Sequence, residues 1–221
     1  MTFPLTICNG YTIIEIDGKK FMLDSGSPMS ISTDPKVKSV SINDWRFDLP
    51  CAPQFKKNLD LATGENISGI IALEIIVLLF GVRCDLLRGE AVFGKPPKES
   101  GHVVRLRDRK DFRTQVGVNG REVVGYMDTG APNTMIADHS LLDPRQYVGK
   151  ANEPMLTEIL PTEKYDGSAE LDGVVRRVPL LKLPQRCIYP AFRDVQAYFS
   201  VATFAEQYYA IDPNDQELRF I

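Results

Sequence analysis

Two short segments of this 221-residue chain follow one pattern and constrain its fold more than any other feature. The first is Asp24-Ser25-Gly26, continued by Ser27-Pro28-Met29-Ser30, and the second is Asp128-Thr129-Gly130, continued by Ala131-Pro132-Asn133-Thr134. A single Asp-Ser/Thr-Gly is ordinary turn chemistry, and roughly one chain in ten of this length carries one by chance. Two copies that agree over seven consecutive positions indicate the two halves of an acid–base site that needs a pair of carboxylates.

The repeat extends on both sides of the two segments. Upstream, Asp17-Gly18 and Asn119-Gly120 each separate two apolar runs, which predicts a β-hairpin whose second strand ends at the motif aspartate. Downstream, residues 85–93 and 212–220 align without a gap, and we expect each to be a hairpin that closes its half. This pattern indicates duplication of a small domain, with about 23 extra residues in the second half, in loops between Ile136 and Asp194.

The domain organisation follows from this repeat. We expect an N-terminal lobe over residues 1–95, a linker over residues 96–101 and a C-terminal lobe over residues 102–221, each lobe large enough to bury a core. Many short β-rich runs, with 16 Gly and 15 Pro, favour an all-β fold over a helical one. The longest apolar run, residues 67–82, is interrupted by polar residues and is interpreted as a buried strand leading into a short helix.

Composition and charge exclude several other classes of protein. The net charge of −3 gives no reason to expect nucleic acid as a partner, and the basic stretch Arg105–Arg113 is interrupted by two aspartates, so we interpret it as a solvated strand face. The histidines and cysteines lack the spacing of a metal site, which predicts no metal and no other cofactor. We recognise no nucleophile elbow and no phosphate-binding loop in the sequence.

The cellular location is predicted from what the sequence lacks. Neither a signal peptide nor a membrane-spanning segment is recognisable, so we expect a cytoplasmic protein without a membrane partner. The four cysteines are widely scattered, and reduced thiols fit that location. A disulfide stays open as an alternative if the protein is exported.

With these residues in view, the chain resembles the pepsin/retropepsin superfamily of aspartic proteases, and the resemblance covers both lobes. It implies that Asp24 and Asp128 are the catalytic aspartates and that the hydroxyl groups of Ser25 and Thr129 interlock beneath them. It also implies an all-β fold of two pseudo-symmetric lobes with short helices and a cleft between them. The other supporting positions, two glycines that permit a tight loop and the residues that follow them, are Gly26, Ser27, Gly130 and Ala131.

The resemblance is incomplete at two places. Residues 69–76 and 199–204 look like the family's hydrophobic-hydrophobic-Gly segment with its short helix, but the usual glycine is Ala72 in one lobe and Ser200 in the other. Either residue fits if its φ is negative and is strained if φ is positive. For a flap over the cleft, Tyr165 and Trp45 are candidates, with a core or strand-face position as the alternative for each.

The function that these residues predict is hydrolysis of peptide bonds. Two carboxylates that share one site cannot both ionise at low cost, so one can hold a proton while the other activates a water. We therefore expect an aspartic endopeptidase that acts on extended peptides or unfolded proteins as a monomer. The alternative is a catalytically inactive pepsin-like module that binds peptides or mediates assembly, and a peptidase that must first shed part of its N-terminus is a third possibility.

Overall fold

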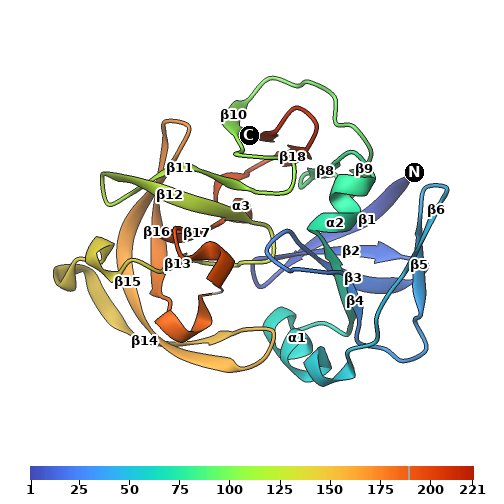
Figure 1. Ribbon diagram of the computed structural model, residues 1–221, viewed down its shortest axis with the longest axis horizontal. Helices are drawn as coiled ribbons and strands as arrows, with labels where there is room; N and C mark the ends of the chain where they lie inside the picture. The colour runs from blue at the N-terminus through green and yellow to red at the C-terminus, as the bar shows by residue number, and fades with distance from the viewer. Residues whose placement is uncertain (189) are drawn as a thin grey trace.

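A computed structural model describes residues 1–188 and 190–221, and its two lobes lie side by side (Figure 1). The fold is mostly β with a few short helices, as the sequence predicts. The N-terminal half contains β1 (Thr2–Cys8), β2 (Tyr11–Ile16), β3 (Lys19–Asp24), β4 (Ile31–Ser32), β5 (Ser39–Ile42), β6 (Trp45–Asp48), η1 (Pro53–Phe55), α1 (Lys56–Thr63), β7 (Ile67–Ala72), α2 (Leu73–Leu78), β8 (Val82–Asp85) and β9 (Glu90–Phe93).

Residues 94–101 connect β9 to the second half as irregular chain. The second half contains β10 (His102–Arg105), β11 (Arg113–Val118), β12 (Arg121–Asp128), β13 (Thr134–Ile136), η2 (His139–Leu141), η3 (Pro144–Gln146), β14 (Tyr147–Pro154), β15 (Ile159–Leu171), β16 (Val174–Lys182), η4 (Gln185–Cys187), η5 (Pro190–Phe192), β17 (Ala197–Ser200), α3 (Val201–Phe204), β18 (Tyr208–Asp212) and β19 (Glu217–Phe220).

The sequence repeat corresponds to a structural repeat with the same strand register. Strand β3 runs parallel to β7 with Asp24 opposite Ala72, and β12 runs parallel to β17 with Asp128 opposite Ser200. Strands β4 and β13 pair antiparallel with β7 and β17 on their other sides. The hairpin turns also agree, because Asp17-Gly18 and Asn119-Gly120 all adopt positive φ, as a tight two-residue turn requires.

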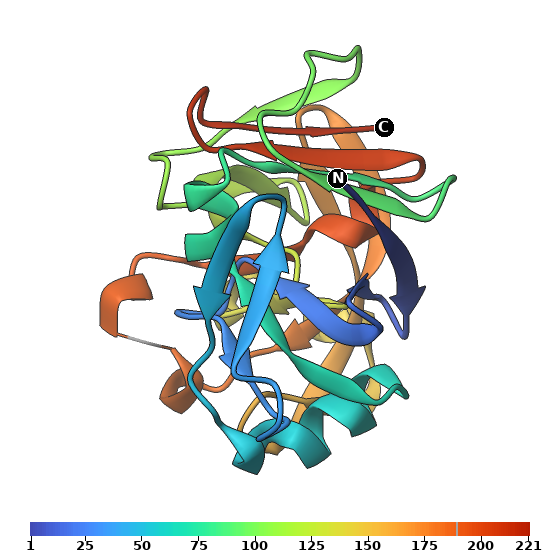
Figure 2. The same cartoon turned by 90° about the vertical axis from the view of Figure 1, so that its right-hand side faces the viewer.

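The closing hairpins join the two halves of the chain. Strand β18 pairs with β8, so one ten-stranded sheet runs in the order β10-β19-β18-β8-β9-β1-β2-β3-β7-β4. Figure 2 shows the β18–β19 and β8–β9 hairpins side by side in this sheet, near the top of the molecule. The aspartates at matching positions have matching roles: Asp85 accepts a hydrogen bond from the Arg88 amide at 2.9 Å, and Asp212 accepts one from the Asn214 amide at 3.0 Å. Each carboxylate holds the turn that follows it.

The extra residues of the second half form long antiparallel strands. Strands β14, β15 and β16 extend a seven-stranded sheet of order β11-β12-β17-β13-β16-β15-β14, and β15 joins β16 through the Asp172-Gly173 turn. They lie between Ile136 and Asp194, where the sequence predicts the insertion. Strand β14 runs from the C-terminal lobe to α1 of the other lobe, as Figure 1 shows. This insertion therefore bridges the two lobes.

A hydrophobic core of buried residues is shared by both lobes. Phe21, Phe199, Tyr209 and Phe220 are among its largest fully buried side chains, and all six residues of β7 are buried. Because α2 follows β7 at once, the interpretation of residues 67–82 as a buried strand and a short helix is confirmed. This packing fixes the carboxyl ends of β3 and β7, where the first motif begins.

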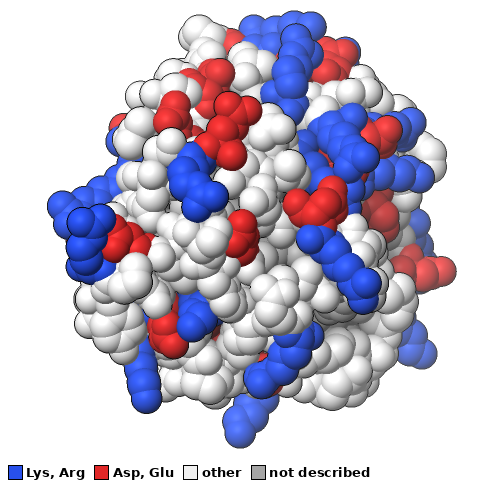
Figure 3. Space-filling view, turned by 60° about the vertical axis from the view of Figure 1, so that its left-hand side comes forward, with Lys and Arg blue, Asp and Glu red and all other residues white. Residues whose placement is uncertain are grey.

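One expectation about the surface is wrong. Residues 106–112, in the middle of the basic stretch, are not a strand face, because β10 ends at Arg105 and β11 begins at Arg113. The backbones of Asp108 and Asp111 exchange two hydrogen bonds of 3.1 Å and close a turn between the strands. Elsewhere, on the face drawn in Figure 3, basic and acidic side chains are interspersed.

Two further observations concern the helices and the thiols. Within residues 1–188 and 190–221, no helix is long and apolar enough to span a membrane. All four cysteines are free thiols, and burial raises the pKa of the Cys84 thiol to about 12.

We predict that Gly69→Ala destabilises the fold, because a Cβ at this position of β7 would overlap the backbone carbonyl of Ile31 on β4. Overpacking of this kind typically costs about 1–3 kcal/mol of unfolding free energy, measured by urea denaturation. Ser41→Ala, at an exposed position of β5, serves as the control and should change it by less than about 0.5 kcal/mol. Equal midpoints for the two variants would contradict the predicted overlap.

Candidate active site

The two motif aspartates meet where the lobes meet. Asp24 ends β3 and Asp128 ends β12, and their carboxyl groups lie within hydrogen-bonding reach of each other. Both residues keep some exposure, toward a pocket, while the surrounding protein desolvates the carboxyl groups. Two positions 104 residues apart in the sequence thus form one carboxyl pair.

Backbone amides of each loop fix the orientation of its carboxylate. Oδ1 of Asp24 accepts hydrogen bonds from the amides of Gly26 and Ser27, both at 2.9 Å. Oδ1 of Asp128 accepts one from the amide of Gly130 at 2.8 Å, the equivalent position. One oxygen of each carboxyl group is therefore held by its own loop, which limits how the groups can rotate.

The hydroxyl residues of the motifs cross-link the two loops symmetrically. The amide of Ser25 donates to Oγ1 of Thr129 at 2.9 Å, and the amide of Thr129 donates to Oγ of Ser25 at 3.0 Å. Each hydroxyl then donates to the opposite strand, Ser25 to the Met127 carbonyl and Thr129 to the Leu23 carbonyl, both at 3.1 Å. All four bonds are buried, so they hold the loops in one register.

The two motif glycines are required by close approach rather than by backbone conformation. Neither has a positive φ, but a Cβ on Gly26 would overlap the carboxylate of Asp128, and a Cβ on Gly130 would overlap that of Asp24. Each loop therefore packs its backbone directly against the opposite carboxyl group. Both glycines lie in the turn after the aspartate, as the sequence predicts, and this steric requirement is a further reason why neither position carries a side chain.

The departures from the hydrophobic-hydrophobic-Gly pattern cause no backbone strain. Ala72 has φ −99° and Ser200 has φ −67°, both in regions open to any residue. The amide of Ala72 donates to Oγ of Ser30 at 2.8 Å, which anchors the residue that ends the first motif. Oγ of Ser200 is buried and has no hydrogen-bond partner among the residues that the structure describes.

Burial and mutual repulsion shift the titration of the carboxyl pair. Desolvation raises the pKa of Asp24 well above its usual value, and the charge of Asp128 raises it further. Desolvation also raises the pKa of Asp128, although amides that donate to it work in the opposite direction. Two desolvated carboxyl groups within hydrogen-bonding reach of each other share one proton over a wide pH range, because ionising both would place like charges together. Such a pair can accept and donate a proton at one place.

The pair lies in a cavity of about 150 Å³, here named the dyad pocket. Its walls come from both motif loops, from α1 (Asn58, Leu59 and Ala62) and from the tip of the β14–β15 hairpin, residues 153–156. The hydroxyl of Tyr11 donates to the Pro154 carbonyl at 3.3 Å, and Nδ2 of Asn58 donates to the Leu156 carbonyl at 3.2 Å. The hairpin tip therefore spans from one lobe to the other beside the carboxyl pair.

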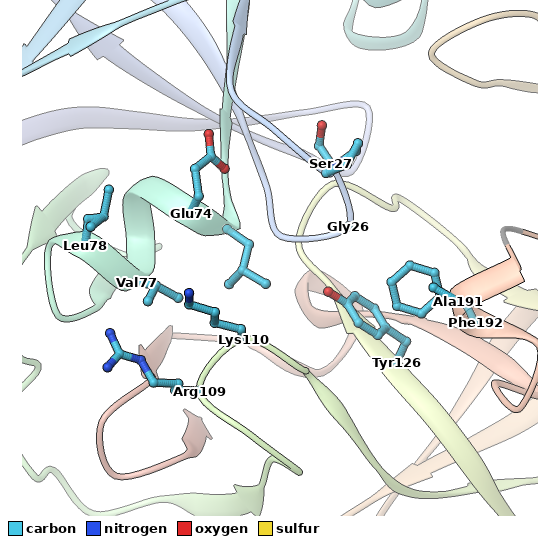
Figure 4. Close-up of a pocket in the computed structure, with 12 residues that line it drawn as sticks. Gly26, Ser27, Glu74, Val77, Leu78, Arg109, Lys110, Tyr126, Ala191 and Phe192 are labelled. Carbon is cyan, nitrogen blue, oxygen red and sulfur yellow. The ribbon is translucent and has the colours of Figure 1, made fainter.

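A larger cavity of about 590 Å³, here named the apolar pocket, continues from the dyad pocket and shares its residues 26–28. Figure 4 shows α2 on one side of it, with Val77 and Leu78, and Tyr126 and Phe192 on the other. Arg109 and Lys110 lie along its lower edge in that view, in the turn between β10 and β11. Two pockets of different chemistry thus adjoin each other at the first motif loop.

Neither of the two flap candidates reaches the dyad pocket, and this expectation is corrected. Trp45 is 58% exposed at the start of β6, in a two-stranded hairpin at the outer edge of its lobe in Figure 1. Tyr165 is buried in β15, far along the strand from the tip, and donates a hydrogen bond to Glu163 at 2.6 Å. The segment that does line the pocket, residues 153–156, is the opposite end of the same β14–β15 hairpin.

Four charged side chains at the site were not expected from the sequence. Glu153 lines the dyad pocket, and Glu74, Arg109 and Lys110 line the apolar pocket. Asp108 and Asp111 interrupt the basic stretch, and aspartates of this kind are typical of turns. They could have identified the loop that carries Arg109 and Lys110. Glu153 had no comparable signal, because only the pairing of β14 with β15 brings it near the motif loops. In the described part of the chain, no group of three or more His, Cys, Asp or Glu side chains is placed to hold a metal ion.

Comparison with solved structures supports the fold. The chain is similar to the crystal structure of the aspartic proteinase from Irpex lacteus, with a TM-score of 0.55 over 99% of this chain and 96% of that chain. The two sequences are 9% identical, so the similarity concerns the fold: two lobes in the pepsin-like arrangement. No protein-family model matches the sequence. No curated protein sequence matches it either.

We predict that Thr129→Val lowers the free energy of unfolding by roughly 2–4 kcal/mol, measured by urea denaturation. Valine keeps the shape but leaves the Ser25 amide and the Leu23 carbonyl buried without the partners that they have now. Thr129→Ser retains the hydroxyl and is the matched control, with a loss well below that of valine. If serine were as destabilising as valine, the lost methyl group rather than the hydroxyl would be responsible.

We predict that Asp24→Asn stabilises the fold increasingly as the pH rises. The raised pKa of Asp24 means that the folded state binds more protons than the unfolded state between the unfolded value, about 3.9, and the raised value. The protonated Asp24 therefore contributes to the stability of the wild type, in full below the unfolded pKa, and this contribution is lost as the pH rises through the folded pKa. Unfolding free energies of variant and wild type should therefore differ least near pH 3 and most near pH 8. If the difference in unfolding free energy between variant and wild type became smaller as the pH rises, the pKa of Asp24 would be lowered and not raised in the folded state.

Proposed function

We propose that this protein is an aspartic endopeptidase that hydrolyses peptide bonds through a water activated by Asp24 and Asp128. The proposal is carried by one observation: equivalent positions of a duplicated fold bring two desolvated carboxyl groups within hydrogen-bonding reach of each other, in a pocket that both lobes line. The pepsin-like fold adds support of a general kind, since fold alone does not specify activity.

The single proton that the two carboxyl groups share suits this chemistry. With one proton shared, the ionised carboxylate takes a proton from the water as its oxygen attacks the peptide carbonyl. The protonated carboxyl group donates to the oxyanion that develops on that carbonyl, and the proton taken from water passes to the leaving amine. The reaction requires no covalent intermediate, and the four buried bonds between the loops keep both groups in place throughout.

The two pockets suggest how a substrate would lie. An extended peptide would cross the carboxyl pair with side chains in the dyad pocket on one side and the apolar pocket on the other. Because one chain supplies both aspartates, a monomer suffices. The β14–β15 tip, held by Tyr11 and Asn58, would take the part of the flap and would move aside for the peptide.

The test is cleavage of unfolded casein and of a mixed peptide library between about pH 3 and pH 8. We predict that Asp24→Asn and Asp128→Asn each lower kcat/KM by at least about 10²-fold, because each removes one partner in proton transfer. Asp48→Asn, at an exposed position of β6, is the matched control and should keep full activity.

Two results would count against the proposal. Cleavage that survives both active-site substitutions would assign the activity to other residues. A folded, monodisperse wild type that cleaves nothing at any pH would favour a pepsin-like module that binds peptides, and retention of library peptides would then be measured.

A further inference from the structure

The dyad pocket contains a third carboxyl group. Glu153, near the end of β14, is 6% exposed and lines the pocket together with Asp24 and Asp128. Nδ2 of Asn133 donates to both of its oxygens, at 3.2 and 3.4 Å. Asn133 belongs to the second motif loop, so the loop that carries Asp128 also fixes the position of Glu153.

This carboxyl group is buried without a cation. Among residues 1–188 and 190–221, no Lys, Arg or His lines the dyad pocket or forms an ion pair with Glu153. Burial raises the pKa of Glu153, and the amide of Asn133 opposes that shift only in part. A buried carboxylate is costly unless a charge or several donors compensate it, so this position favours binding of a positive group from outside.

The rest of the pocket suits a long aliphatic chain. Its walls contain apolar side chains from both lobes, among them Met22, Leu59, Ala62, Met135 and Leu156. Lysine and arginine combine an apolar stem with a charged end, and such side chains bury the stem against apolar surface. Apolar walls with one carboxylate offer contacts to both parts of these side chains.

We propose that Glu153 selects substrates that present a lysine or arginine side chain to the dyad pocket, next to the bond that is cleaved. This inference rests on the proposed peptidase function and adds a substrate class to it. The apolar pocket would receive a side chain on the other side of the scissile bond, so the two sides of the cleft would differ in preference.

The pH dependence follows from the groups that face Glu153. These are the carboxyl pair and Tyr11, whose pKa is raised first by burial and then by the charge of Glu153. The raised pKa of Glu153 means that its carboxylate forms only above the usual pH range of a glutamate. The preference for basic side chains therefore grows as the pH rises through that range, and it is weakest in acid.

The experiment compares peptides that differ at one position, with lysine, norleucine or glutamine placed in turn at each site around the cleaved bond. Norleucine keeps the aliphatic stem of lysine and lacks its ammonium group. For the wild type we expect kcat/KM to favour lysine over norleucine by about 10- to 100-fold at one position near neutral pH. Glu153→Gln should reduce this ratio to about one. Glu158→Gln, which removes an exposed carboxylate on the same hairpin that pairs with Arg186, should leave the ratio unchanged.

Binding of uncleavable analogues separates this inference from the proposed function. Analogues with a reduced scissile bond, carrying lysine or norleucine, are titrated against wild type, Glu153→Gln and Glu153→Asp, and the aspartate variant keeps the charge if the glutamine variant does not fold. A lysine preference lost in Glu153→Gln and retained in part in Glu153→Asp supports the inference. Equal binding of both analogues by the wild type overturns the inference even if cleavage occurs. Faster cleavage of the glutamine peptides than of the lysine peptides overturns it as well. Selective binding without any cleavage would overturn only the peptidase proposal.

Discussion

The structure of the candidate site depends on the paired hydrogen bonds between Ser25 and Thr129. Each hydroxyl accepts from the opposite loop and donates to the opposite strand, so neither loop has a complete set of partners without the other. These bonds are buried and join the two lobes at the base of the carboxyl pair. Tyr126 adds an unsymmetrical fifth bond, from its hydroxyl to the Ser25 carbonyl at 3.0 Å. The position of the aspartates is therefore a property of the interface between the lobes and not of either lobe alone.

The same interface explains why some motif positions tolerate change and others do not. Gly26 and Gly130 lie so close to the opposite carboxylates that no side chain fits. Ala72 and Ser200 lie opposite the aspartates on the neighbouring parallel strands, where a negative φ accepts a small side chain. What matters at each position is the local distance to the carboxyl pair, which a sequence pattern does not contain.

Local chemistry made much of this fold predictable. The turns at Asp17-Gly18 and Asn119-Gly120, the strand and helix of residues 67–82 and the closing hairpins all follow from short-range signals, and the structure has them. The parts that could not be predicted depend on long-range pairing. The tip of the β14–β15 hairpin reaches the pocket only because β14 extends to α1, and this placement brings in Glu153 and leaves Tyr165 behind. The prediction of Trp45 as a flap residue was wrong for the same reason. Its strand β6 pairs only with β5 in the described sheets, so this hairpin does not extend to the cleft.

Duplication gave this chain two equivalent loops, but the surroundings of the loops have diverged. Two residues before each aspartate, Met22 lines the dyad pocket and Tyr126 lines the apolar pocket. The buried carboxyl group of Glu153 lines the dyad pocket, whereas the cations Arg109 and Lys110 line the apolar pocket together with Glu74. A symmetrical carboxyl pair has no intrinsic direction. Since the dyad pocket adds one carboxyl group and the apolar pocket adds two cations and one carboxyl group, an extended peptide would meet different electrostatic environments in its two orientations. This asymmetry gives the cleft a polarity that the pair itself lacks.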